Sequence, residues 1–247
     1  MATIVPFRIA RPAAKLRLFC FPFAGAAANV YRTWPRLFGD EVDVCPVELP
    51  GRGLRAREPL AADMVELRTR VTEDLAPLLE DEVPVALFGH SMGAKLAFEL
   101  SKGLGRRVVH LFVSAASAPD VRAPHPMAEL PRAEFISELR RIGGTPEEVL
   151  ADDEVMDLFL PVLRADLRLH EHYVATDGVR APCGVTTFAA TADARVSVDM
   201  ARGWEVFSSG PFRLLTLDAG HHFLGASAAM LAREIVSDLQ KVVRFGH

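Results

Sequence analysis

The sequence predicts an α/β fold in which a mostly parallel central sheet is covered by helices on both faces. Short, almost wholly apolar runs, which are typical of strands buried on both faces, alternate with longer amphipathic stretches. Segment 120–180 breaks this alternation, because it carries helix signals but no clear strand. We therefore expect a sheet core formed by residues 1–119 and 181–247, with residues 120–180 inserted as a helical lid.

The composition predicts a globular protein with one large domain. The chain has 247 residues, enough to bury a substantial core, and 50% of them are hydrophobic while 24% are charged. The formal net charge of −4 provides no general attraction to nucleic acid or to anionic membranes. No apolar run reaches the length of a membrane span without a charge or a break. We therefore expect neither a nucleic-acid partner nor a membrane partner.

The cysteines and the lid histidines give no indication of a metal site. Cys20, Cys45 and Cys183 fall in or beside expected strands without metal-ligand spacing, as reduced core thiols of a cytoplasmic protein do. His170 and His172 have no third ligand nearby in the sequence, so we expect them at the surface or along a chamber. The expectation is a cytoplasmic protein that needs no metal and no cofactor of its own.

The strands are predicted by short runs rich in Val, Leu, Phe and Cys that end at Gly, Pro or polar residues. Such runs favour strands in a parallel sheet covered on both faces. In chain order the expected strands are 16–21, 42–47, 85–88, 108–113, 185–190 and 212–217.

The stretches between these runs predict helices. Asp63 followed by Glu66 is the pattern of a capping box, and apolar residues at helical spacing come after it. In the lid, Pro146 stands where the first residue of a helix is expected after a possible cap at Thr145. The expected helices are 29–38, one starting at 63, one starting at 92, three in the lid (131–143, one starting at 145, and 153–173), and 227–243.

The strongest functional signal is the motif Gly89-x-Ser91-x-Gly93 between an expected strand and an expected helix. In this strand-turn-helix context the motif is typical of a turn that exposes a nucleophilic serine at the carboxyl edge of a sheet. The helix begins at Met92, so its first amides and the positive end of its dipole face the place where an oxyanion would form. We expect Ser91 to be the nucleophile and the Met92 amide to be one oxyanion donor.

A loop of small residues, 22–28, follows the first expected strand. Backbone amides in such a loop can turn inward beside the nucleophile, and we assign the second oxyanion donor to the amide of Ala24. An ordinary strand-to-helix turn remains an alternative here, because loop amides are not specified by side chains.

An acid and a histidine follow the last two expected strands. Asp193 comes just after one strand and His221 just after the next, so both should lie at the same edge as Ser91. The order serine, acid, histidine is the order of the α/β-hydrolase triad. His222 is an alternative base and Asp120 an alternative acid, and we prefer His221 and Asp193.

The most basic stretch of the chain is a loop that carries Arg52, Arg55 and Arg57. The lid segment, by contrast, holds more acidic than basic residues. An acidic partner should therefore approach the rim of the sheet rather than the lid, and one or more of these arginines would contact it. The alternative is a solvated loop with no docking role.

At this point the chain resembles the type II thioesterases that accompany polyketide and non-ribosomal peptide synthases. The resemblance extends over nearly the whole length, and the matches in the lid weigh most because lids vary between hydrolase families. The matching motifs are FPFAG at 21–25, PGRG at 50–53, FGHSMGA at 88–94, FEL at 98–100, RIGGTP at 141–146, LPVLRAD at 160–166, Asp193 and Gly220-His221.

The resemblance implies an α/β-hydrolase fold and an editing activity. Such enzymes hydrolyse acyl groups held as thioesters on the phosphopantetheine arm of acyl or peptidyl carrier domains, so phosphopantetheine belongs to the substrate. We expect the protein to act as a monomer. The alternatives are a carboxylesterase or lipase, or a chain-terminating thioesterase, with the same triad. A non-catalytic binding protein would require Ser91, Asp193 or His221 to be missing or misplaced.

Overall fold

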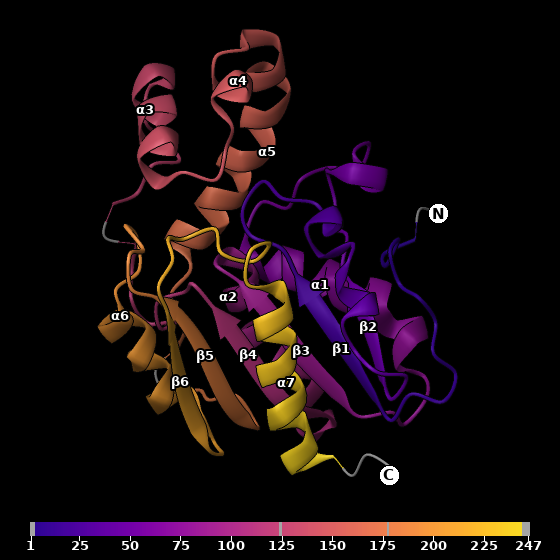
Figure 1. Cartoon of the computed structure of the whole chain (residues 1–247). Coiled ribbons are helices and arrows are strands. Elements are labelled where there is room, and N and C mark those ends of the chain that lie inside the picture. The colour runs from indigo at the N-terminus through magenta and orange to yellow at the C-terminus, as the bar shows by residue number, and fades with distance from the viewer. Residues whose placement is uncertain (1–2, 124, 177, 244–247) are drawn as a thin grey trace.

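The computed structural model describes residues 3–123, 125–176 and 178–243, and six strands of this part of the chain form one sheet (Figure 1). Every pairing between them is parallel. The predicted α/β class with a parallel central sheet is thereby confirmed. The strands are β1 (Leu16–Phe21), β2 (Val42–Pro46), β3 (Val85–His90), β4 (Val108–Ser114), β5 (Gly184–Ala190) and β6 (Phe212–Leu217).

The strand order is β2-β1-β3-β4-β5-β6, so the direction in which successive strands are added to the sheet reverses between β1 and β3. The chain runs from β1 outward to β2 and then crosses to β3 on the other side of β1. In open parallel sheets, ligands bind outside the carboxyl ends of the strands at such a point. The loops after β1 and β3 therefore flank the expected site.

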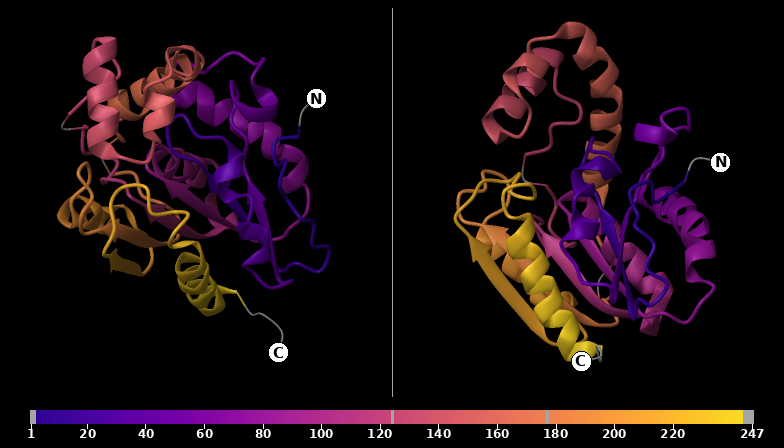
Figure 2. Two further views of the ribbon diagram at one scale, coloured as in Figure 1. Left: turned by 45° about the horizontal axis from the view of Figure 1, so that its top comes forward. Right: turned by 45° about the vertical axis from the view of Figure 1, so that its right-hand side comes forward.

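Helices cover both faces of the sheet because its side chains alternate between two apolar clusters. Phe19, Leu87 and Leu111 point to one side, where α1 and α2 pack, while Leu18 and Phe88 point to the other, where α7 packs. Figure 1 shows α7 in front of the sheet and α1 and α2 behind it, and Figure 2 shows the same layers from two other directions. The helices of these layers are α1 (Met64–Leu75), α2 (Met92–Leu104) and α7 (Ala228–Val242). A short helix, α6 (Val198–Arg202), follows β5.

Three further helices stand over the carboxyl ends of the strands as a separate layer (Figure 1). They are α3 (Arg132–Ile142), α4 (Glu147–Leu150) and α5 (Asp153–His172), and all three lie within the segment 120–180. They share an apolar cluster of their own, which includes Phe135, Leu150 and Leu160. The lid is thus a small packed unit rather than an extended loop.

The ends of several helices differ from the expectation. At α1 the capping box is present, since Asp63 Oδ1 accepts from the Glu66 amide at 2.8 Å, although Glu66 reaches back to the amide of Ala62. The helix α4 begins one residue later than expected, with Pro146 rather than Thr145 at the N-cap position, because its first hydrogen bonds go to the carbonyl of Pro146. Terminal shifts of this size are common.

The prediction of a helix over 29–38 was wrong. The chain forms two short 3₁₀ helices there instead, separated at Arg32 and Thr33. Pro35 has no amide hydrogen to donate to the preceding turn, which prevents one continuous α-helix. The 3₁₀ helices are Ala28–Tyr31, Trp34–Arg36, Gly53–Arg55, Ala76–Leu79, Gly105–Arg107 and Gly203–Phe207.

None of the helices in the described ranges is both long and apolar enough to cross a membrane.

Candidate active site

Ser91 occupies a strained turn between β3 and α2. Its backbone has φ 54° and ψ −116°, a conformation that L-residues rarely adopt. The two flanking glycines make the turn possible: a Cβ on Gly89 would lie 2.1 Å from the carbonyl oxygen of Gly93, and a Cβ on Gly93 would lie 2.3 Å from that of Phe21. Both obstacles are backbone, which cannot move aside as a side chain can.

Substitution of Gly93 is therefore expected to distort the turn. Gly93→Ala should lower the free energy of unfolding by about 2–3 kcal/mol, the range for forcing an extra carbon into a packed site. In a chain of this size the midpoint of thermal unfolding should fall by roughly 5–10 °C. Gly103→Ala is the matched control: it lies in the same helix, a Cβ there meets nothing within 4 Å, and helix propensity favours alanine. Equal unfolding midpoints for the two variants would contradict the steric argument.

The structure brings Ser91, His221 and Asp193 into one line of hydrogen bonds. His221 Nε2 lies 3.2 Å from Ser91 Oγ, and His221 Nδ1 lies 2.7 Å from Asp193 Oδ2. The three residues follow β3, β6 and β5, so the parallel sheet delivers them to one edge. Both His221 and Asp193 are buried. This is the arrangement in which a histidine can take the serine proton while a carboxylate orients the imidazole.

Asp193 is held as a carboxylate. Burial by itself would raise the pKa of this acid, but the hydrogen bond and charge of His221 and the amides of Arg195 and Val196 outweigh it, and the pKa lies below its ordinary value. The two amides donate to Asp193 Oδ1 at 2.7 and 3.1 Å, which leaves Oδ2 for His221. Oδ1 thus binds the two backbone amides and Oδ2 binds the imidazole.

The alternative acid and base take no part in this line of hydrogen bonds. Asp120 is exposed, whereas Asp193 bonds His221. His222 packs edge-on against Phe23, with ring centroids 5.0 Å apart, while the hydrogen bond to Ser91 Oγ comes from His221. Gly144 in the lid has no room for a Cβ because that atom would fall 2.2 Å from the His222 ring. His222 therefore belongs to the contact between the lid and the site.

His90 is a site residue that the sequence argument missed. It is fully buried behind His221, and burial holds the pKa of His90 well below its ordinary value, so the ring is neutral. Its Nε2 lies 3.0 Å from the carbonyl oxygen of His221 and its Nδ1 lies 2.8 Å from Ser114 Oγ. Because a carbonyl only accepts, Nε2 carries the proton, and it fixes the backbone of the His221 loop. The sequence signal for His90 was its position between Gly89 and Ser91, but the motif Gly-x-Ser-x-Gly allows any residue there.

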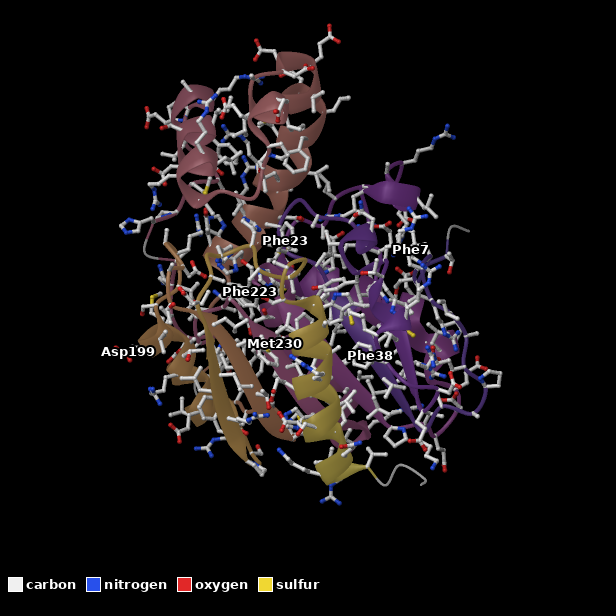
Figure 3. All side chains as sticks on the ribbon, viewed as in Figure 1. Phe7, Phe23, Phe38, Asp199, Phe223 and Met230 are labelled. Atoms are coloured by element: carbon white, nitrogen blue, oxygen red, sulfur yellow. The ribbon has the colours of Figure 1, made fainter. Side chains whose placement is uncertain are left out.

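A cavity of about 420 Å³ opens above Ser91 and His221, within the usual size of small-ligand sites. Its wall is largely apolar and comes mainly from the lid and from the loop after β1, with Phe23 lying between the lid and the sheet (Figure 3). Ala24 lines this same cavity, and Met92 is buried at the start of α2. The lid side chains include Ile142, Val149, Phe159, Leu163, Leu167 and His170.

His170 lies along this chamber, and His172 is exposed. Among the described residues, no group of three His, Cys, Asp or Glu side chains could hold a metal ion.

The docking role expected for the basic loop was wrong for two of its three arginines. Arg52 and Arg55 are each only 6% exposed. Arg52 pairs with the buried carboxylate of Asp166, and Arg55 bonds Glu58 and Asp74 at 2.6 Å. These guanidinium groups connect parts of the fold and have no free face for a partner. Arg57 is exposed.

Comparisons with known proteins agree with this geometry. The thioesterase domain family model matches residues 16–242. The gramicidin S biosynthesis protein GrsT of Aneurinibacillus migulanus is 35% identical over 236 residues, which cover 94% of this chain and 91% of that protein.

Solved structures give the same result. RedJ, a thioesterase from the prodiginine pathway of Streptomyces coelicolor, superposes with a TM-score of 0.85 at 36% identity, covering 93% of this chain and 87% of that one. BorB, a type II thioesterase from the borrelidin biosynthetic cluster, superposes with a TM-score of 0.80 at 35% identity, covering 94% and 96%. The chain therefore belongs to the thioesterase domain family, and within it to the type II thioesterases, hydrolases that act on thioesters.

Proposed function

We propose that the protein hydrolyses acyl thioesters from the phosphopantetheine arm of acyl or peptidyl carrier domains, and so clears stalled or wrongly loaded units from a polyketide or non-ribosomal peptide synthase. The observation that carries this proposal is the line of hydrogen bonds from Ser91 through His221 to Asp193 at the base of an apolar cavity. The biosynthetic pathways named for GrsT, RedJ and BorB support the choice of synthase.

The chemistry follows from the positions of the three side chains. Ser91 Oγ attacks the thioester carbonyl as His221 Nε2 takes its proton, and the amides of Met92 and Ala24 hold the oxyanion. When the carbon–sulfur bond breaks, the acyl group stays on Ser91 and the thiol leaves with the proton held by His221. Water, deprotonated by His221, then attacks the ester, and His221 gives the proton to Ser91 Oγ as the free acid leaves.

The leaving group and the cavity wall support an enzyme that selects its substrates by their thioester link more than by one particular acyl chain. A thiol has a pKa of roughly 8.5, so its departure requires less protonation than that of an alcohol or an amine. The cavity is apolar and accepts hydrocarbon without specific hydrogen bonds.

The proposed setting is that of a cytoplasmic enzyme that acts as a monomer. Its partners would be carrier domains, with no nucleic acid and no membrane involved, and it would use no cofactor of its own. Arg57 is the residue of the basic loop that is exposed enough to contact an acidic carrier.

The decisive assay compares one acyl group in two linkages. The purified protein is given an acyl-loaded carrier protein and an oxygen ester of the same acid, and release of the acid is measured for each. We expect kcat/KM to be at least about tenfold higher for the carrier thioester, because a thiol, with its lower pKa, leaves more readily than an alcohol. A clear preference for the oxygen ester would instead indicate a carboxylesterase or lipase.

A further inference from the structure

The cavity above Ser91 is lined by an arginine that the proposed reaction does not use. Among the described residues that line this cavity, Arg195 is the only lysine or arginine, and none is an aspartate or glutamate. The backbone of Arg195 is fixed by the triad, because its amide donates to Asp193 Oδ1 at 2.7 Å. The half-buried side chain lines the cavity together with the catalytic His221.

The guanidinium of Arg195 has no carboxylate partner within the described ranges. The side chain's hydrogen-bonding contact is with Met127, whose Sδ lies 3.0 Å from Nη1. A thioether sulfur is uncharged and a weak acceptor, so it does not balance the charge. Arg195 therefore brings a full positive charge into a largely apolar cavity.

The acids whose charges act on Arg195 are bonded to other groups. They are Glu171, Asp193 and Glu138, which bond two backbone amides, the imidazole of the triad and another arginine, respectively. Burial lowers the pKa of Arg195, and the three acids, which raise it, do not restore its ordinary value. The group is still protonated at neutral pH, because the ordinary pKa of arginine is far higher. An anion added to the cavity would therefore be stabilised here.

A second polar group of the cavity lacks a partner. His170 is 8% exposed, and its Nδ1 is buried with no hydrogen-bond partner among the described residues. Burial holds the pKa of His170 well below its ordinary value, and the charges of Lys95 and Arg195 lower it further, so the ring is neutral. With its proton on Nδ1, such a ring donates one hydrogen bond. A ligand oxygen would satisfy this buried nitrogen.

A carboxylate at the end of the acyl chain is the anion that suits these groups. The guanidinium is planar, and its parallel N–H groups match the two oxygens of a carboxylate. The acyl chain is the part of the substrate that enters the cavity with the thioester carbonyl. The phosphate of the phosphopantetheine arm, by contrast, lies at the far end of the arm from that carbonyl.

We propose that Arg195 is a specificity-determining residue: it binds the free carboxylate of acyl groups derived from dicarboxylic acids, so that the enzyme accepts these as well as hydrocarbon chains. This inference rests on the proposed function, whose substrate class it extends. The bonds that form and break in the hydrolysis stay the same.

Matched pairs of acyl groups isolate the effect of the carboxylate. Each pair consists of a dicarboxylic half-thioester (malonyl, succinyl or glutaryl) and the acyl group in which an isopropyl group of similar shape replaces the carboxylate. All are presented on N-acetylcysteamine, which carries neither phosphate nor protein, and kcat/KM is measured for each. The ratio of the two values within a pair cancels any effect of a variant on folding or on the triad.

Arg195→Met removes the charge and keeps much of the length of the side chain. We expect it to lower the ratio of charged to neutral substrate about 10- to 100-fold for the pair that fits best, the usual effect of a hydrogen bond to a charged group. Arg195→Lys keeps the charge without the planar fork and should give an intermediate ratio. Arg202→Met, at an exposed position of α6, removes the same charge and should keep the ratio of wild type.

A pair of boronic acids gives a readout that does not require hydrolysis. An alkyl boronic acid forms a tetrahedral adduct with an active serine, so its affinity reports on occupancy of the cavity. One compound ends in a carboxylate and the other in an isopropyl group. We expect Arg195→Met to weaken the first relative to the second by about 10- to 100-fold.

An unchanged ratio in Arg195→Met for every pair would overturn the inference. A loss seen only with coenzyme A thioesters, and equal for both members of a pair, would also overturn it, because Arg195 would then bind the phosphate of the arm. If wild type hydrolyses no thioester, the proposed function fails. The boronic acids would still decide whether Arg195 binds a carboxylate in this cavity.

Discussion

Ser91→Ala is expected to reduce kcat/KM for acyl thioesters by about 10⁴-fold or more, the size of effect seen when the nucleophile of a serine triad is removed. Without Oγ no acyl-enzyme forms, and His221 has no hydroxyl to deprotonate at 3.2 Å. The turn itself should be preserved, since alanine only removes the oxygen. Release of free thiol, followed with a chromogenic thiol reagent, measures the loss.

Ser101→Ala provides the matched control for this variant. Ser101 is a buried serine of the same helix, and its Oγ donates to the carbonyl of Phe98 at 2.7 Å, away from the cavity. It should keep wild-type turnover. A serine-directed phosphonate should label wild type and Ser101→Ala but not Ser91→Ala. Retention of more than a few per cent of activity in Ser91→Ala would show that the reaction does not pass through this hydroxyl.

Asp193→Asn is expected to lower kcat by about 10⁴-fold with little change in KM, as when the acid of a serine triad is made neutral. The reason is that the two oxygens of Asp193 bond different partners. The amides of Arg195 and Val196 both donate to Oδ1, so the carbonyl oxygen of an asparagine would take that side. Its NH₂ group would then face His221 Nδ1, which must lose its proton to accept. That tautomer carries the proton on Nε2 and cannot take one from Ser91.

The matched control is Asp199→Asn on α6, which changes the same functional group at an exposed position close in sequence. Steady-state kinetics of both variants on one thioester, with thermal unfolding to verify the fold, tests the argument. If Asp193→Asn raised KM and left kcat unchanged, Asp193 would act in substrate binding and not on the imidazole.

Much of the fold could be predicted because its signals are local. A strand such as β3 is buried on both faces, so it is a continuous apolar run, and the serine turn requires glycine on each side of Ser91 wherever it occurs. The positions of Asp193 and His221 just after their strands indicated one edge of the sheet. The helix expected over 29–38 failed where Pro35 interrupts the amide pattern.

The rest depends on partners far away in the chain. Arg52 and Arg55 were expected at the surface because arginine usually is exposed, and nothing nearby in the sequence reveals that Asp166 lies 114 residues further on against Arg52. His90 and the hydrogen bond from the Gly25 amide to Asp166 were missed for the same reason. Pairings across more than a hundred residues are set by packing, which a single sequence does not display.

The helix α5 extends from the sheet core into the outer part of the lid. Below Pro161 it is tied to the core, through Asp166 and through the carbonyl of His170, which accepts from the buried ammonium of Lys95 at 3.3 Å. Above Pro161 it contributes Phe159 to the ceiling of the chamber and packs with the other lid helices. Substitutions in the outer turns can therefore reshape that end of the chamber while the hydrogen bonds between the inner turns and the core stay in place.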